Sequence, residues 1–101
     1  MTLTGVAARD LAAARAWFTQ PGAGKRAARR LGVLAAALRD LRDHPCRWPR
    51  GEQPGTRARH AEGYRILYEV VPDTGDDATA GDVTVLRLFG PGQDRTDLGR
   101  G

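Results

Sequence analysis

The segment Gly63-Tyr64-Arg65-Ile66-Leu67-Tyr68-Glu69-Val70-Val71 decides the fold, because its β-branched and aromatic residues favour an extended strand. A glycine opens the segment and Pro72 follows it, and both residue types are typical of strand ends. Side chains alternate across a strand, so one face is largely apolar and the other carries a cation, Arg65. The apolar face, which we expect to cover the core, consists of Tyr64, Ile66, Tyr68 and Val70.

Two segments that precede this strand have the composition and the periodicity of helices. Ala7–Phe18 is rich in alanine and leucine, and Lys25–Asp43 places leucines at three- and four-residue steps along one face. The break at Gln20–Gly24 is short, so we expect the two helices to pack antiparallel. The leucine face consists of Leu31, Leu34, Leu38 and Leu41, and the opposite, solvated face of Arg26, Arg29, Arg30 and Arg39.

Three further segments are predicted strands: Met1–Thr4 as a short edge strand, Thr56–Glu62 before the central strand, and Val83–Phe89 after it. In the last of these we expect Leu86 and Leu88 to join the core face. The predicted architecture is α+β, with an antiparallel two-helix hairpin packed on a small antiparallel sheet in the order strand–helix–helix–strand–strand–strand. We expect a single domain over residues 1–92 and a loose tail over residues 93–101.

Composition restricts the compartment and the partners. The chain has 101 residues, a formal net charge of +4 and a single cysteine, Cys46, which excludes an internal disulfide framework and is typical of a reducing cytoplasm. No apolar run approaches the roughly 20 residues that span a bilayer. The two histidines and the cysteine lie far apart in the sequence, so we expect neither a metal nor an organic cofactor. A basic domain of this size favours an anionic partner, either nucleic acid or an acidic protein segment.

The string Gly63-Tyr64-Arg65-Ile66-Leu67-Tyr68 resembles the central strand of the RelE/ParE family of bacterial toxins. The order of the predicted elements agrees with that family over nearly the whole chain. The resemblance implies a cytoplasmic toxin of a type II toxin–antitoxin system. It also implies an antitoxin partner whose acidic or amphipathic segment covers the basic face.

The candidate site is the sheet face that carries Arg65. If the helices cover the Tyr64 face, this second face presents Arg65 and Arg87, and we expect the neighbouring strand to add further bases. Several guanidinium groups on one concave face bind phosphate, and in RNA cleavage through the 2′-hydroxyl they stabilise the charge that develops on the phosphorane. The further candidates are Arg57, Arg59 and Arg95.

By resemblance, Arg65 matches the catalytic arginine that follows the first tyrosine of the family's central strand. Arg57 and Arg59 approximate a family pair of basic residues that hold RNA, and Arg95 approximates the arginine that follows the last strand. Arg87 matches no family motif, so its inclusion depends on the predicted face alone.

The proton-transfer residues stay open. Ribonuclease members of the family place a Tyr or a His near the C-terminus, whereas this chain has no Tyr after Tyr68 and no His after His60. Glu62, His60, Glu69 and the more distant Glu52 are the alternatives. The favoured hypothesis is an mRNA-cleaving endoribonuclease (an mRNA interferase) that blocks translation and arrests growth. The alternatives are a ParE-type inhibitor of DNA gyrase, which needs no acid–base pair, and an inactive relative that only binds its antitoxin.

Overall fold

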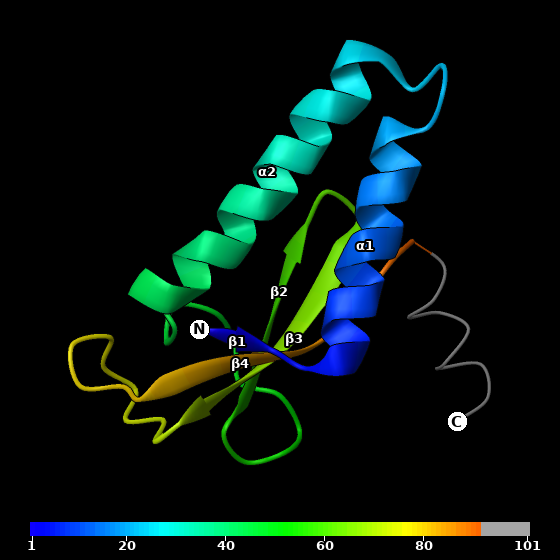
Figure 1. Ribbon diagram of the computed structural model, residues 1–101. Coiled ribbons are helices and arrows are strands. Elements are labelled where there is room, and N and C mark those ends of the chain that lie inside the picture. Colours follow the sequence, from blue (N-terminus) through cyan, green and yellow to red (C-terminus); the bar gives the residue numbers. More distant parts are fainter. Residues whose placement is uncertain (92–101) are drawn as a thin grey trace.

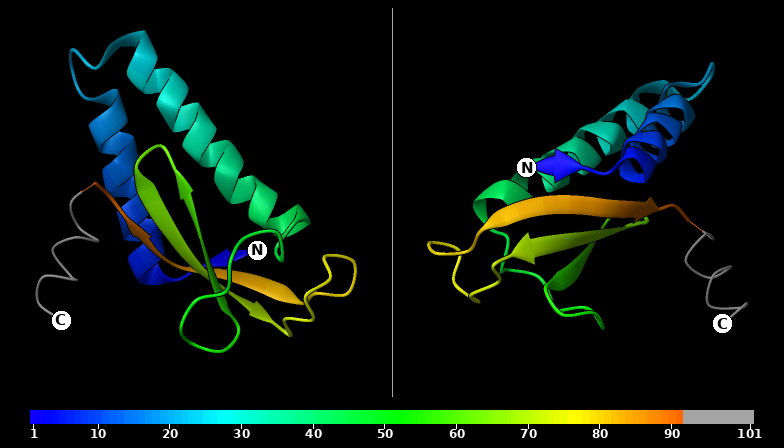
Figure 2. Two further views of the ribbon diagram at one scale, coloured as in Figure 1. Left: turned by 180° about the vertical axis from the view of Figure 1, so that it is seen from behind. Right: turned by 60° about the horizontal axis from the view of Figure 1, so that its bottom comes forward.

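The computed structural model describes residues 1–91 of the chain (Figure 1). The elements follow in the order β1 (Thr2–Leu3), α1 (Gly5–Thr19), α2 (Gly24–Asp43), β2 (Thr56–Ala61), β3 (Tyr64–Val71) and β4 (Asp82–Phe89). Both helices lie on one side of the sheet (Figure 2), so the predicted α+β fold is confirmed. Neither helix within the described range is long and apolar enough to cross a membrane. The predicted tail over residues 93–101 lies outside the described residues.

The sheet has the strand order β1-β4-β3-β2 and is mixed, which corrects the prediction of a wholly antiparallel sheet. β1 runs parallel to β4, with Thr2 opposite Thr84. Two bonds from Thr4 hold this pairing, because its backbone N–H donates to Val85 O at 3.0 Å and its Oγ1 donates to Leu86 O at 2.9 Å. The same Oγ1 accepts from Ala7 N at 3.0 Å and caps α1, so one side chain joins the first helix to the last strand.

The core lies between the helices and β3, as the alternation along that strand predicted. Tyr68 and Ile66 are fully buried, and the Tyr68 hydroxyl donates to Pro45 O at 2.6 Å, so burial leaves no unpaired phenol. Burial raises the pKa of this phenol to about 12. The leucine face of α2 packs in the same core as these two side chains, although Leu31 is only partly buried at the margin. The buried leucines of α2 are Leu34, Leu38 and Leu41.

A bulge in β4 reverses the alternation of that strand. Leu67 lies opposite Arg87 and Tyr68 lies opposite Val85, so Leu86 is an extra residue on the β4 side. Val83, Val85 and Leu88 are therefore the buried residues of β4. The prediction that Leu86 joins the core is wrong, because the bulge turns this residue to the opposite face of the sheet.

Candidate functional site

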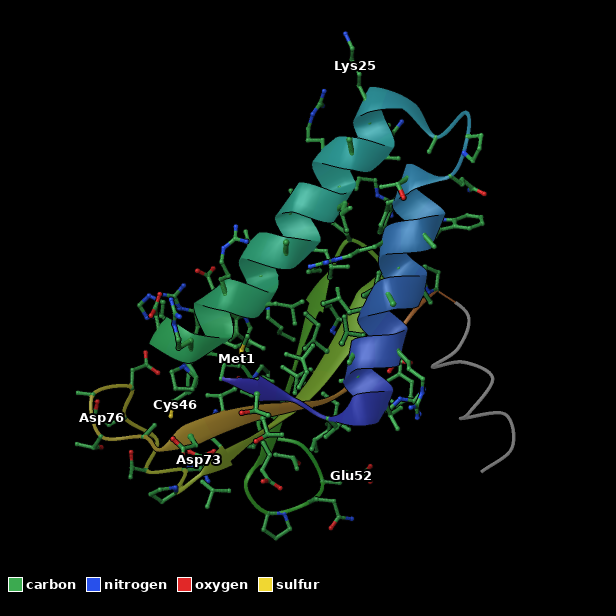
Figure 3. The ribbon with its side chains drawn as sticks, in the orientation of Figure 1. Met1, Lys25, Cys46, Glu52, Asp73 and Asp76 are labelled. Carbon is green, nitrogen blue, oxygen red and sulfur yellow. The ribbon has the colours of Figure 1, made fainter. Side chains whose placement is uncertain are left out.

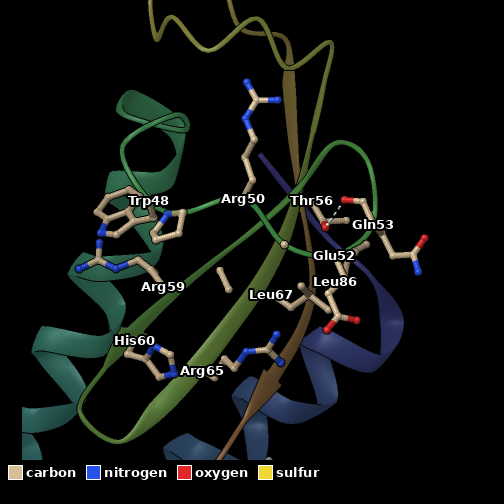
Figure 4. A pocket seen from close by; sticks show the side chains of 13 residues that line it. Trp48, Arg50, Glu52, Gln53, Thr56, Arg59, His60, Arg65, Leu67 and Leu86 are labelled. Atoms are coloured by element: carbon tan, nitrogen blue, oxygen red, sulfur yellow. Dashed lines mark hydrogen bonds between the residues drawn. The ribbon is translucent and has the colours of Figure 1, made fainter.

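The sheet face that points away from the helices forms one side of a groove of about 770 Å³ (Figure 4). Apolar side chains of the three longer strands form its floor, and the segment 48–53 that precedes β2 forms its wall. Arg65 lies opposite His60 in the β2–β3 register, so a guanidinium and an imidazole stand side by side on this floor. The apolar floor residues are Ala58, Leu67 and Leu86.

Arg65 is half-buried and packs against an aromatic ring. Phe89 lies directly opposite it on β4, and the Arg65 Cζ atom is 5.6 Å from the centre of the Phe89 ring. A cation–π contact of this kind contributes about 0.5–1 kcal/mol at a partly exposed site and limits the rotamers of the arginine. The predicted position of Arg65 on the face away from the helices is confirmed.

Arg87 packs on the same ring but is tied to the first helix. Its Cζ atom is 4.6 Å from the Phe89 ring centre, and its Nε donates to Asp10 Oδ2 at 2.8 Å. The same carboxylate oxygen accepts from the backbone N–H of Leu88 at 3.0 Å. Asp10 therefore joins α1 to β4 through one bond from the Arg87 side chain and one from the Leu88 backbone. Arg87 thus has a structural role.

Arg57 is buried on the helix side of the sheet, which corrects its expected place on the open face. It lies opposite Tyr68 in the register and is 5% exposed. Its Nε and one terminal nitrogen donate to the two Asp73 carboxylate oxygens at 2.8 and 3.0 Å. The other terminal nitrogen donates to Trp48 O at 2.6 Å and to Cys46 O at 3.2 Å. Arg57 thus holds together β2, the segment before it and the β3–β4 connection.

The Asp73 carboxylate depends on this partner. Hydrogen bonds from Arg57 lower the pKa of Asp73 from 3.8 to about 2, and the bond to Asp73 in turn raises the pKa of Arg57. The two side chains are 5% and 6% exposed, so they form a buried ion pair. A buried pair of this geometry has a structural role, because neither group is open to a ligand.

Arg59 also faces the helices and not the floor of the groove. Its Cζ atom lies 4.0 Å above the centre of the Trp48 ring, and a terminal nitrogen donates to Ala37 O of α2 at 3.3 Å. Burial lowers the pKa of this guanidinium, and its Nε has no hydrogen-bond partner among residues 1–91. Arg59 contributes to the margin of the groove next to Trp48, as Figure 4 shows.

The turn between β2 and β3 explains why Arg57 and Arg59 lie on the helix side of the sheet and not on the predicted open face. Glu62 and Gly63 form a two-residue turn with φ of 52° and 81°, and Ala61 lies opposite Tyr64. Residues that lie opposite one another share a face, so every second residue counted back from Ala61 lies on the Tyr64 side. A two-residue turn at Glu62-Gly63 therefore places Arg57 and Arg59 on the same face as Tyr64.

The remaining predicted residues are dispersed. The carboxylate of Glu62 accepts from Arg30 Nε of α2 at 3.1 Å, which places this acid in a contact between the turn and the helix. That contact also corrects the predicted solvation of Arg30, which is half-buried and lies 5.1 Å above the centre of the Phe18 ring. His60 is exposed on the groove floor, and Arg95 lies outside the described residues.

The groove wall was not predicted from the sequence. Arg50 and Glu52 line the groove from the segment before β2, although the glycines and prolines of that segment predict only a loop. The groove therefore has arginine side chains beside an apolar floor, where they can bind an anionic group. His60 is a titratable side chain next to Arg65 in the same groove. Within residues 1–91 no group of three His, Cys, Asp or Glu side chains is placed to hold a metal ion.

Comparison with protein families places the chain in a known family. The model of a family described as the ParE toxin of the type II toxin–antitoxin system, parDE, matches residues 2–91. This range includes all six elements of the fold and every residue of the groove. Among curated proteins, none matches the chain.

Proposed function

We propose that this chain, which belongs to the ParE toxin family of type II toxin–antitoxin systems, inhibits DNA gyrase and does not cut RNA. Membership of the family makes the chain the toxin of such a system and implies an antitoxin as its partner. Gyrase is the target to which resemblance to the ParE branch points. On this proposal the groove floor around Arg65 contacts a protein surface.

The positions of Arg57 and Arg59 are the observation that carries the proposal. These arginines were the expected RNA contacts, yet Arg57 is committed to Asp73, and Arg59 is committed to the Ala37 carbonyl and the Trp48 ring. Cleavage through the 2′-hydroxyl requires several donors on one phosphate together with an acid and a base. A protein-directed surface requires only shape and a few anchors, and an arginine held on an aromatic ring is a common anchor.

Ribonuclease activity is the second candidate, and one contact favours it. His60 lies opposite Arg65 on the groove floor, so a potential base stands beside a potential phosphate ligand. On this alternative His60 would take the 2′ proton and Arg65 would stabilise the phosphorane. The two candidates differ in their need for His60, because proton transfer requires its imidazole and a protein contact does not.

The test compares four proteins in two assays. Wild type, Arg65→Ala, His60→Ala and the control Arg42→Ala, which removes a cation that is 68% exposed on α2, are added to purified gyrase with relaxed plasmid. In parallel, primer extension maps transcript 5′ ends in cells that express each protein. We expect wild type, His60→Ala and Arg42→Ala to block supercoiling, and folded Arg65→Ala to lose at least tenfold in potency.

New 5′ ends that require both Arg65 and His60, with supercoiling unaffected, would replace the proposal with the ribonuclease. Absence of both activities in the wild type would leave a relative that only binds its antitoxin. Full potency in Arg65→Ala would show that the groove floor is not the surface that contacts gyrase.

A further inference from the structure

The outer part of the helical hairpin contains bases and no acid. Residues 11–39 include no Asp or Glu, although this range covers most of both helices. Arg30, one of the bases in this range, forms an ion pair with Glu62 in the turn between β2 and β3. The exposed bases of the range are Arg15, Lys25, Arg26, Arg29 and Arg39.

Three of these bases gather where the hairpin turns. Lys25, Arg26 and Arg29 lie in the first two turns of α2, at the end of the hairpin that projects beyond the sheet (Figure 1). The Lys25 side chain points away from the rest of the molecule at this end (Figure 3). Apart from Gln20 and the bases themselves, the exposed residues of the turn and its margin are small or lack a long side chain, so another molecule can approach the backbone closely. These residues are Pro21, Gly22, Gly24 and Ala28.

Helix energetics do not favour this distribution of charge. The N-terminus of a helix is its positive end, where acids stabilise and bases destabilise by about 0.3–1 kcal/mol each. The first turn of α2 contains no acid, and Ala23 supplies no side-chain cap. A helix that only needed a solvated face would place these bases near its C-terminus. An anionic group at this end would interact favourably with the bases and with the positive end of the helix.

We propose that the turn end of the hairpin, with Lys25, Arg26 and Arg29, binds the phosphate backbone of duplex DNA. Lys25 and Arg29 are four residues apart, so they lie on one side of the helix with their Cβ atoms roughly 6 Å apart. Both can therefore contact one phosphate strand while Arg26 contacts it from the flank. A phosphate backbone requires charge and close approach but no apolar pocket.

The surface at this end favours nucleic acid over an acidic protein segment. An amphipathic segment needs apolar anchors, and the apolar groove of the hairpin, which runs from Ala28 past Leu31 to Leu38, is lined by none of the three bases. The choice of duplex DNA over RNA rests on the proposed function, because gyrase holds duplex DNA while it acts. The hairpin end would add contacts to that DNA while the groove floor contacts the enzyme.

The test measures the binding of a fluorescent DNA duplex by anisotropy between about 50 and 200 mM salt, the range over which phosphate contacts lose affinity steeply. Lys25→Ala/Arg29→Ala is compared with Arg9→Ala/Arg42→Ala, which removes the same charge from exposed positions outside the hairpin end. Each lost phosphate contact lowers the salt slope by about 0.9. We expect the first pair to lower the slope by nearly 2 and the affinity at least tenfold, and the control pair to change affinity less than threefold.

Thermal unfolding and a second nucleic acid complete the test. Lys25→Ala/Arg29→Ala should unfold no lower than wild type, because alanine favours helix and the lost bases lay at the positive end. Equal losses in the two pairs, or undiminished binding in the first pair, would overturn the proposal. Tighter binding of single-stranded RNA through the same two residues would overturn the choice of DNA. If the DNA result holds while the gyrase assay of the wild type is negative, the proposed function fails and the DNA contact stands.

Discussion

Replacing Asp73 with Asn tests whether one buried ion pair holds the two connections next to the groove. The substitution keeps the shape of the side chain and removes its charge, so Arg57 stays buried with carbonyl partners alone. The remaining acceptors are the oxygen of the introduced amide and the backbone oxygens of Trp48 and Cys46. The Asp73 side chain is 5% exposed, and solvent can therefore compensate little for the lost charge.

The shift in pKa gives the magnitude. Arg57 lowers the pKa of Asp73 from 3.8 to about 2, and each unit corresponds to about 1.4 kcal/mol. The charged carboxylate thus contributes about 2 kcal/mol to the free energy of unfolding at neutral pH. Because the folded pKa is the lower one, this contribution is present above pH 3.8 and is lost as the pH falls toward 2. The substitution also leaves the buried Arg57 charge without a counter-charge. We therefore expect Asp73→Asn to lower the free energy of unfolding by about 2–4 kcal/mol.

Urea unfolding of wild type and Asp73→Asn at pH 7 and at several values down to pH 2.5 measures both effects. The gap between the two proteins should narrow as the pH falls below 3.8, because the Asp73 carboxyl of the unfolded wild type then takes up a proton while that of the folded state stays charged. Asp43→Asn, whose carboxylate is 63% exposed, is the matched control and should change the free energy of unfolding by less than about 1 kcal/mol. A loss below about 0.5 kcal/mol in Asp73→Asn, or a gap independent of pH, would refute the reasoning.

Two further substitutions test the fold around the central strand. Tyr68→Phe should cost about 1–3 kcal/mol in urea unfolding, because it leaves the Pro45 carbonyl without its buried 2.6 Å donor; a neutral result would mean that water replaces the hydroxyl. Gly63→Ala should cost about 1–2 kcal/mol, because the residue has φ of 81° and an added Cβ would lie 3.2 Å from Pro91. Gly32→Ala, in a helix with open space around the new methyl, should instead stabilise by about 0.5–1 kcal/mol, and equal effects at both glycines would contradict this account.

The sequence predicted those features that depend on local periodicity. The alternation of Tyr64, Ile66 and Tyr68 and the leucine spacing of α2 each report one buried face, and both patterns were confirmed. The predicted position of Arg65 follows from the same alternation. Periodicity fails at Leu86, because a bulge adds a residue to one strand and reverses every face beyond it. The composition of β4 does not predict that Leu86 is the extra residue of a bulge.

The site was less predictable, because its geometry depends on how separate segments meet. The sequence pattern predicted Arg57 to be an exposed base, and its partner Asp73, 16 positions further along the chain, gives no local sign of the pairing. The same holds for Arg87 and Asp10, which are 77 residues apart. Charge alone thus could not separate arginines that bind a partner from arginines that hold the fold.

The pairing of β1 with β4 restricts when the toxin can mature during synthesis. Thr4 and Asp10 make their bonds to residues 85 to 88, so these anchors of α1 form only after the last strand has been made. A nascent chain that ends before β4 lacks the strand to which Thr4 and Asp10 bind. We infer that a chain terminated before β4 is unfolded and inactive, and that the cell is exposed to the toxin only once β4 has been translated.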